Sequence, residues 1–265
     1  MADQKITALD ANTTPASTDL TVIVDDPGGT PATQKMTVDT LDDYLSASTK
    51  TLTNKTLTAP LFQGLVDSWI SANATWAYAS ETTITVPSGA ATIYQKGDKF
   101  KLTANSVVLQ GYIITVADEL LTVVGDALTN HTFTANYYSH ASNPIGFPNY
   151  FSWTPVLDGF STNPSVSTYT FSLNGTVCHV EISQGGDGTS DATNFTITLP
   201  ISFGGVGDVW GACGFTKDNG ANLAGAGYRI SAALSTLVTI YSDMTTGAWT
   251  ASGAKRTRLT TSYII

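Results

Sequence analysis

Apolar and polar residues alternate at a period of two along much of the C-terminal half of the chain. In the segment 256–265, Leu259, Thr261, Tyr263 and Ile265 fall on one face, and polar residues fall on the other. Turn-forming Gly, Pro, Asn and Asp separate such segments. The strands predicted after residue 150 cover 166–173, 177–183, 195–199, 209–215, 227–233, 237–241 and 256–265. Strands of this number and length predict a β-sandwich or jelly-roll head over 149–265.

A second group of strand-like segments precedes residue 148. These segments are 82–86, 99–102, 107–116, 120–124 and 132–138. They predict a small β-barrel or sandwich over 61–148, with bulky core or rim residues Trp69, Trp76, Tyr94, Phe100 and Tyr112. The run from Asn143 to Pro148 breaks any regular element, which places a domain boundary between residues 148 and 149.

The first 60 residues contain little that could build a core. Segments 20–24 and 33–38 read as strands, and apolar residues at i, i+3 and i+7 predict a short helix over 38–47 that Thr37 or Asp39 could cap. A segment this small is marginal alone, so we expect it to fold against another chain. The apolar residues for that contact are Leu20, Val22, Val24, Val38, Leu41 and Leu45.

The tetrapeptide Lys-Thr-Leu-Thr occurs twice within 50–60. Leu52 and Leu57 are the only large apolar side chains there. One interpretation is a polar, extended linker. The other is that copies of the chain associate here and bury these leucines against one another, which predicts a homo-oligomer.

Composition excludes several classes of function. Only 12% of residues are charged, and the formal net charge of −9 argues against a nucleic-acid-binding protein. No apolar stretch is long enough to cross a bilayer, and no apolar signal segment follows Met1, so we expect a soluble protein made in the cytoplasm without membrane insertion. Cys178 and Cys213 cannot form a disulfide framework, and we expect both to be reduced core residues.

Catalytic and metal-binding chemistry is poorly represented. His131, His140 and His179 lack the spacing of a metal site, and Cys178 and His179 must point to opposite faces of one strand. The acids of the head lie mostly in turns, where aspartate has an ordinary capping role. We therefore expect no enzyme activity, no metal and no cofactor.

Aromatic residues near the predicted loops are the best candidates for ligand binding. Trp210, Tyr228, Tyr241 and Trp249 could offer ring faces, and Arg256, with Lys255 and Arg258, could supply hydrogen-bond donors. Ring faces with a few donors are what sugar recognition uses. The alternative is that the aromatic residues belong to the sandwich core.

Several segments resemble tailed-bacteriophage fibre and appendage proteins. At the N-terminus they are ITALDANTTPA at 6–16, DLTVIVD at 19–25, QKMTV at 34–38 and KTLTNKTLTAP at 50–60. FSWTP at 151–155, GAWTASG at 247–253 and TSYII at 261–265 resemble the terminal head domains of such fibres. The resemblance implies a virion structural protein, usually a homotrimer. Its N-terminus would bind a tail, neck or capsid protein, and its head would bind a host surface glycan or protein.

Three roles remain open under this resemblance. The first is a tail fibre that binds the host receptor, and the second is a head fibre or capsid decoration protein. The third is a short tailspike enzyme, which the sequence disfavours because it lacks both the length and the repeats of a parallel β-helix.

Overall fold

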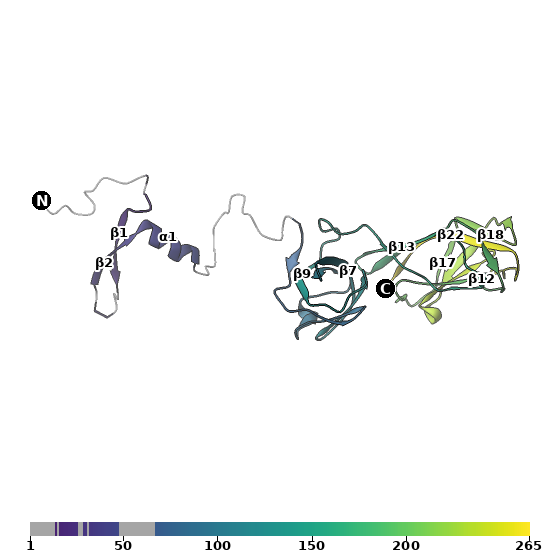
Figure 1. Ribbon diagram of the computed structural model, residues 1–265, viewed down its shortest axis with the longest axis horizontal. Coiled ribbons are helices and arrows are strands. Elements are labelled where there is room, and N and C mark those ends of the chain that lie inside the picture. The colour runs from purple at the N-terminus through teal and green to yellow at the C-terminus, as the bar shows by residue number, and fades with distance from the viewer. Residues whose placement is uncertain (1–13, 15, 26–28, 31, 48–66) are drawn as a thin grey trace. The chain divides into compact units, whose positions relative to one another are not determined.

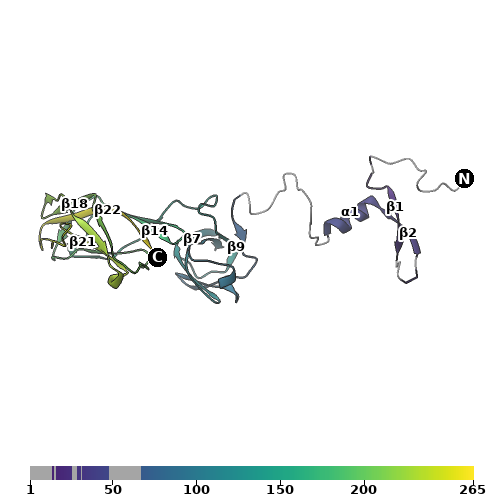
Figure 2. The same ribbon diagram turned by 180° about the vertical axis from the view of Figure 1, so that it is seen from behind.

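The computed structural model describes residues 14, 16–25, 29–30, 32–47 and 67–265. Contacts group the chain into two compact units, Met1–Leu61 and Phe62–Ile265. The described residues form β-sheets with a single α-helix, α1 (Val38–Ala47), as Figures 1 and 2 show. This confirms the predicted all-β fold.

The first unit contains a β-hairpin and α1. Strands β1 (Leu20–Asp25) and β2 (Ala32–Thr37) pair in antiparallel register. Thr37 caps the helix, since its Oγ1 accepts a hydrogen bond from the Thr40 N–H at 3.1 Å. The helix and its cap therefore agree with the prediction.

The predicted anchoring residues are only partly visible. Val38 and Leu41 are half-buried within this unit, whereas Leu20 is 59% exposed. The side chains of Val22, Val24 and Leu45 lie outside the described residues, as do Leu52 and Leu57. Their roles in anchoring and association stay predictions.

The second unit begins with a seven-stranded antiparallel sheet of order β3-β9-β6-β7-β8-β5-β4. Its strands are β3 (Ile70–Ser71), β4 (Ala77–Ser80), β5 (Thr83–Thr85), β6 (Lys99–Ala104), β7 (Val107–Ala117), β8 (Leu120–Gly125) and β9 (Phe133–Ser139). A 3₁₀ turn, η2, covers Ala90–Thr92. All five bulky residues expected in this region are at most 3% exposed, which confirms them as core.

The head consists of two packed sheets. One is eight-stranded, with the path β10 (Phe151–Ser152), β13 (Ser167–Asn174), β14 (Val177–Gln184), β22 (Ala254–Ile264), β15 (Gly188–Ser190) and β12 (Phe160–Thr162), and β18 (Phe215–Asp218) and β19 (Ala221–Asn222) attached through β22. The other has the order β11 (Leu157–Asp158), β16 (Thr196–Thr198), β21 (Leu237–Tyr241), β20 (Gly227–Ile230) and β17 (Val209–Ala212). A 3₁₀ turn, η3 (Ala232–Leu234), follows β20.

Two predicted strands differ from the structure. The segment 227–233 is a strand only to Ile230, because η3 begins at Ala232. The segment 209–215 is not continuous, because β17 belongs to the five-stranded sheet and β18 to the eight-stranded one. Between them, the Cys213 N–H donates to Ala226 and the Gly214 N–H donates to Arg258. The chain thus changes partner strands at this point, a tertiary choice that a period-two pattern does not encode.

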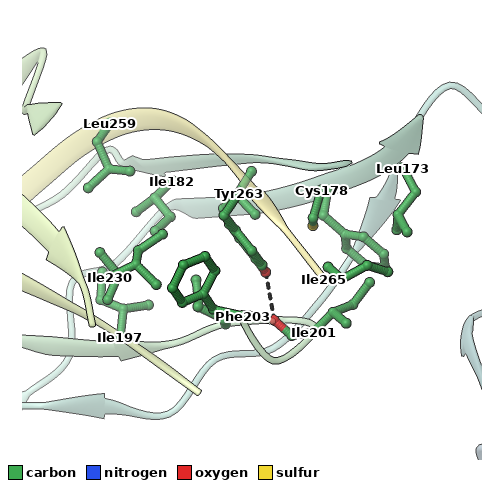
Figure 3. Packing of buried hydrophobic residues seen from close by; sticks show 14 of the residues in the cluster. Leu173, Cys178, Ile182, Ile197, Ile201, Phe203, Ile230, Leu259, Tyr263 and Ile265 are labelled. Atoms are coloured by element: carbon green, nitrogen blue, oxygen red, sulfur yellow. Dashed lines mark hydrogen bonds between the residues drawn. The ribbon is translucent and has the colours of Figure 1, made fainter. Parts of the chain in front are cut away.

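The last strand, β22, confirms the predicted alternation. Leu259, Thr261 and Tyr263 are buried, and so is Ile265 just beyond the strand, while Thr260, Ser262 and Ile264 are exposed. Figure 3 shows Tyr263 between the sheets, where its hydroxyl donates to the Ile201 carbonyl at 2.8 Å. The buried hydroxyl of Tyr263 therefore has a hydrogen-bond partner.

An aromatic cluster joins the head core to the seven-stranded sheet. The ring of Tyr112 lies 5.1 Å from Phe147 and 5.5 Å from Phe151, both in edge-on geometry. The backbone of Gly97, at φ +94°, closely approaches the backbone of Gly175. A Cβ at Gly97 would lie 2.3 Å from the Gly175 carbonyl oxygen. The seven-stranded sheet and both sheets of the head thus belong to one compact unit, and the predicted boundary at 148–149 stays a prediction.

The most demanding feature of the head core is a fully buried lysine. The Lys255 ammonium donates to the carbonyls of Gly159 at 3.1 Å, and of Ala192 and Asn194 at 3.0 Å. Three rings surround it at 5.2 to 5.6 Å, those of Phe160, Phe195 and Trp249. Lys255 is thus no surface donor, which corrects the sequence expectation. Loss of hydration lowers its pKa, against the opposing effect of nearby carboxylates such as Asp218.

We expect Lys255→Met to lower the free energy of unfolding by about 3 kcal/mol or more, because the three carbonyls around the buried ammonium lose their donor. Urea titration of both proteins measures this. The matched control is Lys96→Met, which removes an exposed lysine and should change stability by about 0.5 kcal/mol or less. Equal stability of the two variants would contradict a stabilising role for the buried ammonium.

Burial also sets the reactivity of Cys178. It raises the pKa of this thiol to about 11, and we expect Cys178 to resist iodoacetamide at pH 8 in the native chain but not in urea. Because the folded pKa exceeds the ordinary value of 9.0, the thiol's contribution to stability is present below pH 9 and falls as the pH rises toward 11. Mass spectrometry of alkylated peptides measures the reactivity, with partly buried Cys213 as the internal comparison. Rapid native labelling of Cys178 would contradict its burial.

Candidate functional site

The outer face of the five-stranded sheet presents one row of side chains across all five strands. Strand register aligns Asp158, Thr196, Thr239, Arg229 and Trp210 in that order. Residues paired in this way point to the same face, and neighbouring strands lie about 4.8 Å apart, so the row is about 19 Å long. It places a carboxylate, two hydroxyls, a guanidinium and an indole along one surface.

Trp210 and Tyr241 form an aromatic platform at one end of the row. Their rings stack with centroids 5.9 Å apart and planes 18° from parallel. The guanidinium carbon of Arg229 lies 5.4 Å from the centre of the Trp210 ring. Trp210 is 44% exposed, and Tyr241 is half-buried. The platform therefore leaves part of the Trp210 side chain open to solvent.

Arg229 is held in place by several partners. Its Nε donates to Asp208 at 2.8 Å, and its Nη2 donates to the Ser231 hydroxyl at 3.0 Å. Hydrogen bonding to Tyr241, and then the charge of Asp208, raise its pKa. The pKa of Asp208 is lowered, chiefly by the backbone N–H of Ala232. A charge fixed beside an exposed ring gives this end of the row both stacking and directional hydrogen bonding.

A tight loop follows the C-terminal end of β21, the strand that ends with Tyr241 of the platform. One oxygen of Asp243 accepts from the Thr245 N–H, the Thr245 hydroxyl and the Gly247 N–H, at 2.7 to 2.9 Å. These bonds lower the pKa of Asp243, with the Gly247 bond as the largest cause. Met244, at 49% exposure, lies beside Gly227, where an added Cβ would meet its sulfur at 2.7 Å. The loop thus adds an apolar side chain beside the rings.

The structure separates the residues predicted to bind a receptor. Trp210 and Tyr241 come together, but Tyr228 and Trp249 are 7% and 3% exposed and point into the core. The ring of Trp249 is one of the three that surround the Lys255 ammonium. Its indole N–H donates to the Ile240 carbonyl at 2.7 Å. These two residues therefore offer no ring face to solvent.

Arg256 lies on the other sheet of the head. Its Nε is 3.0 Å from Asp187, and its guanidinium lies 4.8 Å from the centre of the Phe215 ring. The register of β18 and β22 places it opposite Lys217, which also contacts Asp187 at 2.6 Å. Arg256 therefore belongs to an ion-pair cluster on the eight-stranded sheet, away from the platform row.

Four members of the row were missed in the sequence: Arg229, Thr239, Thr196 and Asp158. Arg229 lies in a predicted strand next to Tyr228, where alternation alone would have set it on the face opposite Tyr228. What the sequence lacks is the order of strands, which aligns Arg229 with Trp210. Asp158 lies in a strand of only two residues, too short to give a pattern.

The histidines have simpler environments. His140 Nδ1 lies 2.8 Å from the buried carboxylate of Asp98, a partner that the sequence did not indicate. His179 is exposed and contacts the Ser262 hydroxyl at 2.7 Å, while Cys178 is buried, as alternation predicted. Among the described residues, no group of three or more His, Cys, Asp or Glu could hold a metal ion. Nor does the described part of the chain include a helix long and apolar enough to span a bilayer.

Exposure of Trp210 can be measured directly. We expect Trp210→Phe to remove most of the tryptophan fluorescence that acrylamide quenches, because Trp69, Trp76 and Trp249 are at most 3% exposed. Trp153 is half-buried and should account for the remainder. Trp249→Phe is the matched control and should leave the intensity that acrylamide quenches unchanged. Undiminished quenching in Trp210→Phe would contradict the exposed platform.

Comparison with protein-family models, with curated proteins and with solved structures finds no match.

Proposed function

We propose that this chain is a tailed-bacteriophage virion protein, a trimeric tail fibre whose head binds a host surface glycan through the Trp210 platform. The observation that carries the binding role is the exposed indole of Trp210, stacked on Tyr241 beside Arg229. An open ring face binds the C–H face of a sugar, and neighbouring charged and hydroxyl groups bind its oxygens. The phage assignment rests on the sequence segments that resemble fibre and appendage proteins.

The two compact units support separate roles for the two parts of the chain. The first unit would attach to a tail, neck or capsid protein, because its described hairpin and single helix are too small to form a stable core of their own. The second unit carries the packed cores and the platform. Synthesis in the host cytoplasm and assembly into the virion complete the proposal.

Binding should depend on the platform. We expect Trp210→Ala to weaken binding of the labelled full-length chain by about tenfold or more, because an exposed aromatic anchor is removed. Binding is measured on a panel of bacterial lipopolysaccharides and capsular polysaccharides. Val206→Ala, which truncates a fully exposed side chain elsewhere in the head, is the control and should bind normally. Unchanged binding by Trp210→Ala would overturn the assigned site, and absence of all binding would favour a capsid decoration protein.

Oligomeric state provides a separate test. We expect light scattering after size-exclusion chromatography to give the mass of three chains for the full-length protein. If the second unit holds the interface, a protein lacking residues 1–60 should have the mass of three truncated chains. If Leu52 and Leu57 hold it, the truncated protein should have the mass of a single chain. A monomer in both forms would contradict the trimeric fibre.

A further inference from the structure

A second concave surface of the head lies along β13 and the segment that precedes β11. It has a volume of about 510 Å³, within the range of ligand sites. The groove is lined by Trp153 and Tyr169, by Pro155 and Pro164, and by polar side chains that include Thr154 and Thr168. Asp, Glu, Lys, Arg and His are all absent from its lining. Its chemistry thus differs from that of the platform, where Arg229 and Asp208 carry charge.

The rings of the groove are fixed by bonds to the protein. Trp153 and Tyr169 meet edge-on with centroids 5.6 Å apart. The indole N–H of Trp153 donates to the Thr198 carbonyl at 3.1 Å, and the Tyr169 hydroxyl accepts from Gln184 at 3.2 Å. Trp153 therefore has no N–H left for a ligand and can offer only ring surface, while hydroxyl and amide groups around it supply polar contacts.

Two valines that adjoin lining residues of the groove in sequence are exposed to solvent. Val156 is 69% exposed and Val166 is 86% exposed. Val166 also has φ of +50°, a left-handed conformation that is unfavourable for a β-branched residue. Its carbonyl accepts from the Gly185 N–H at 3.0 Å, which helps to hold the strained backbone. Val166 directly precedes Ser167 of the lining, and an exposed apolar side chain kept in a strained conformation at this position points to a role in binding.

We propose that this groove is a second ligand site, which binds a neutral saccharide. Fixed rings, with exposed valines at positions next to lining residues in sequence, suit the C–H faces of sugar rings. Uncharged hydroxyl and amide side chains suit the hydroxyls of the sugar. A lining without charge does not provide the partners that an acidic glycan requires. Trp210 is not among the residues that line the groove, so this proposal can be tested separately from the proposal for the platform.

Calorimetry of the full-length chain tests the site with dextran, a β-glucan, a galactan and a mannan, and with polygalacturonate as the acidic comparison. We expect saturable binding of at least one neutral polymer and none of polygalacturonate at this site. Val166→Gly should weaken the neutral binding about tenfold while its thermal midpoint stays equal or rises, because glycine relieves the strain. Thr168→Lys, which adds bulk and charge to the groove, should weaken it similarly.

A control variant separates this site from other surfaces. Val206→Gly removes a fully exposed valine elsewhere in the head and should leave neutral binding unchanged. Loss of binding in Trp210→Ala but not in the groove variants would overturn this inference while supporting the platform. Failure of every neutral polymer to bind would overturn it, as would binding of a proline-rich peptide that Val166→Gly abolishes.

Discussion

Solvation of one buried ammonium organises the head. A lysine charge can leave water only if the protein replaces its hydration, and Lys255 receives three carbonyls and three aromatic rings. The carbonyls come from Gly159, Ala192 and Asn194, which lie in two chain segments far from β22 in sequence. The ammonium therefore ties both segments to the last strand.

The hydrogen bonds from Lys255 position the edge of the five-stranded sheet. Gly159 directly follows β11, and Asn194 lies just before β16, so the two strands that begin the platform row are both held near Lys255. Asp158 and Thr196 face outward from this edge. Thr198, at the end of β16, also accepts hydrogen bonds from the Trp153 indole N–H in the groove and from the N–H of Val156, which precedes the lining residue Leu157. Both proposed binding surfaces thus share the same supporting strands.

The surfaces nonetheless differ in how they present their rings. At the platform, the Trp210 indole is open and a guanidinium is fixed beside it, so charge and stacking act together. In the groove, Trp153 is half-buried, its N–H is used internally, and the lining carries no charge. One head could therefore contact two chemically distinct parts of a surface polymer, which increases affinity through multivalency.

The sequence by itself determined the elements whose signals are local. Period-two alternation placed Leu259, Tyr263 and Ile265 on one buried face, and the 38–47 helix followed from apolar spacing and its cap. Only tertiary structure decided that Trp249 and Lys255 are buried while Trp210 is exposed, and that 209–215 divides between two sheets. The physical reason is that alternation tells which side chains share a face of a strand. Which face is covered, and which strands lie side by side, depends on residues distant in the chain.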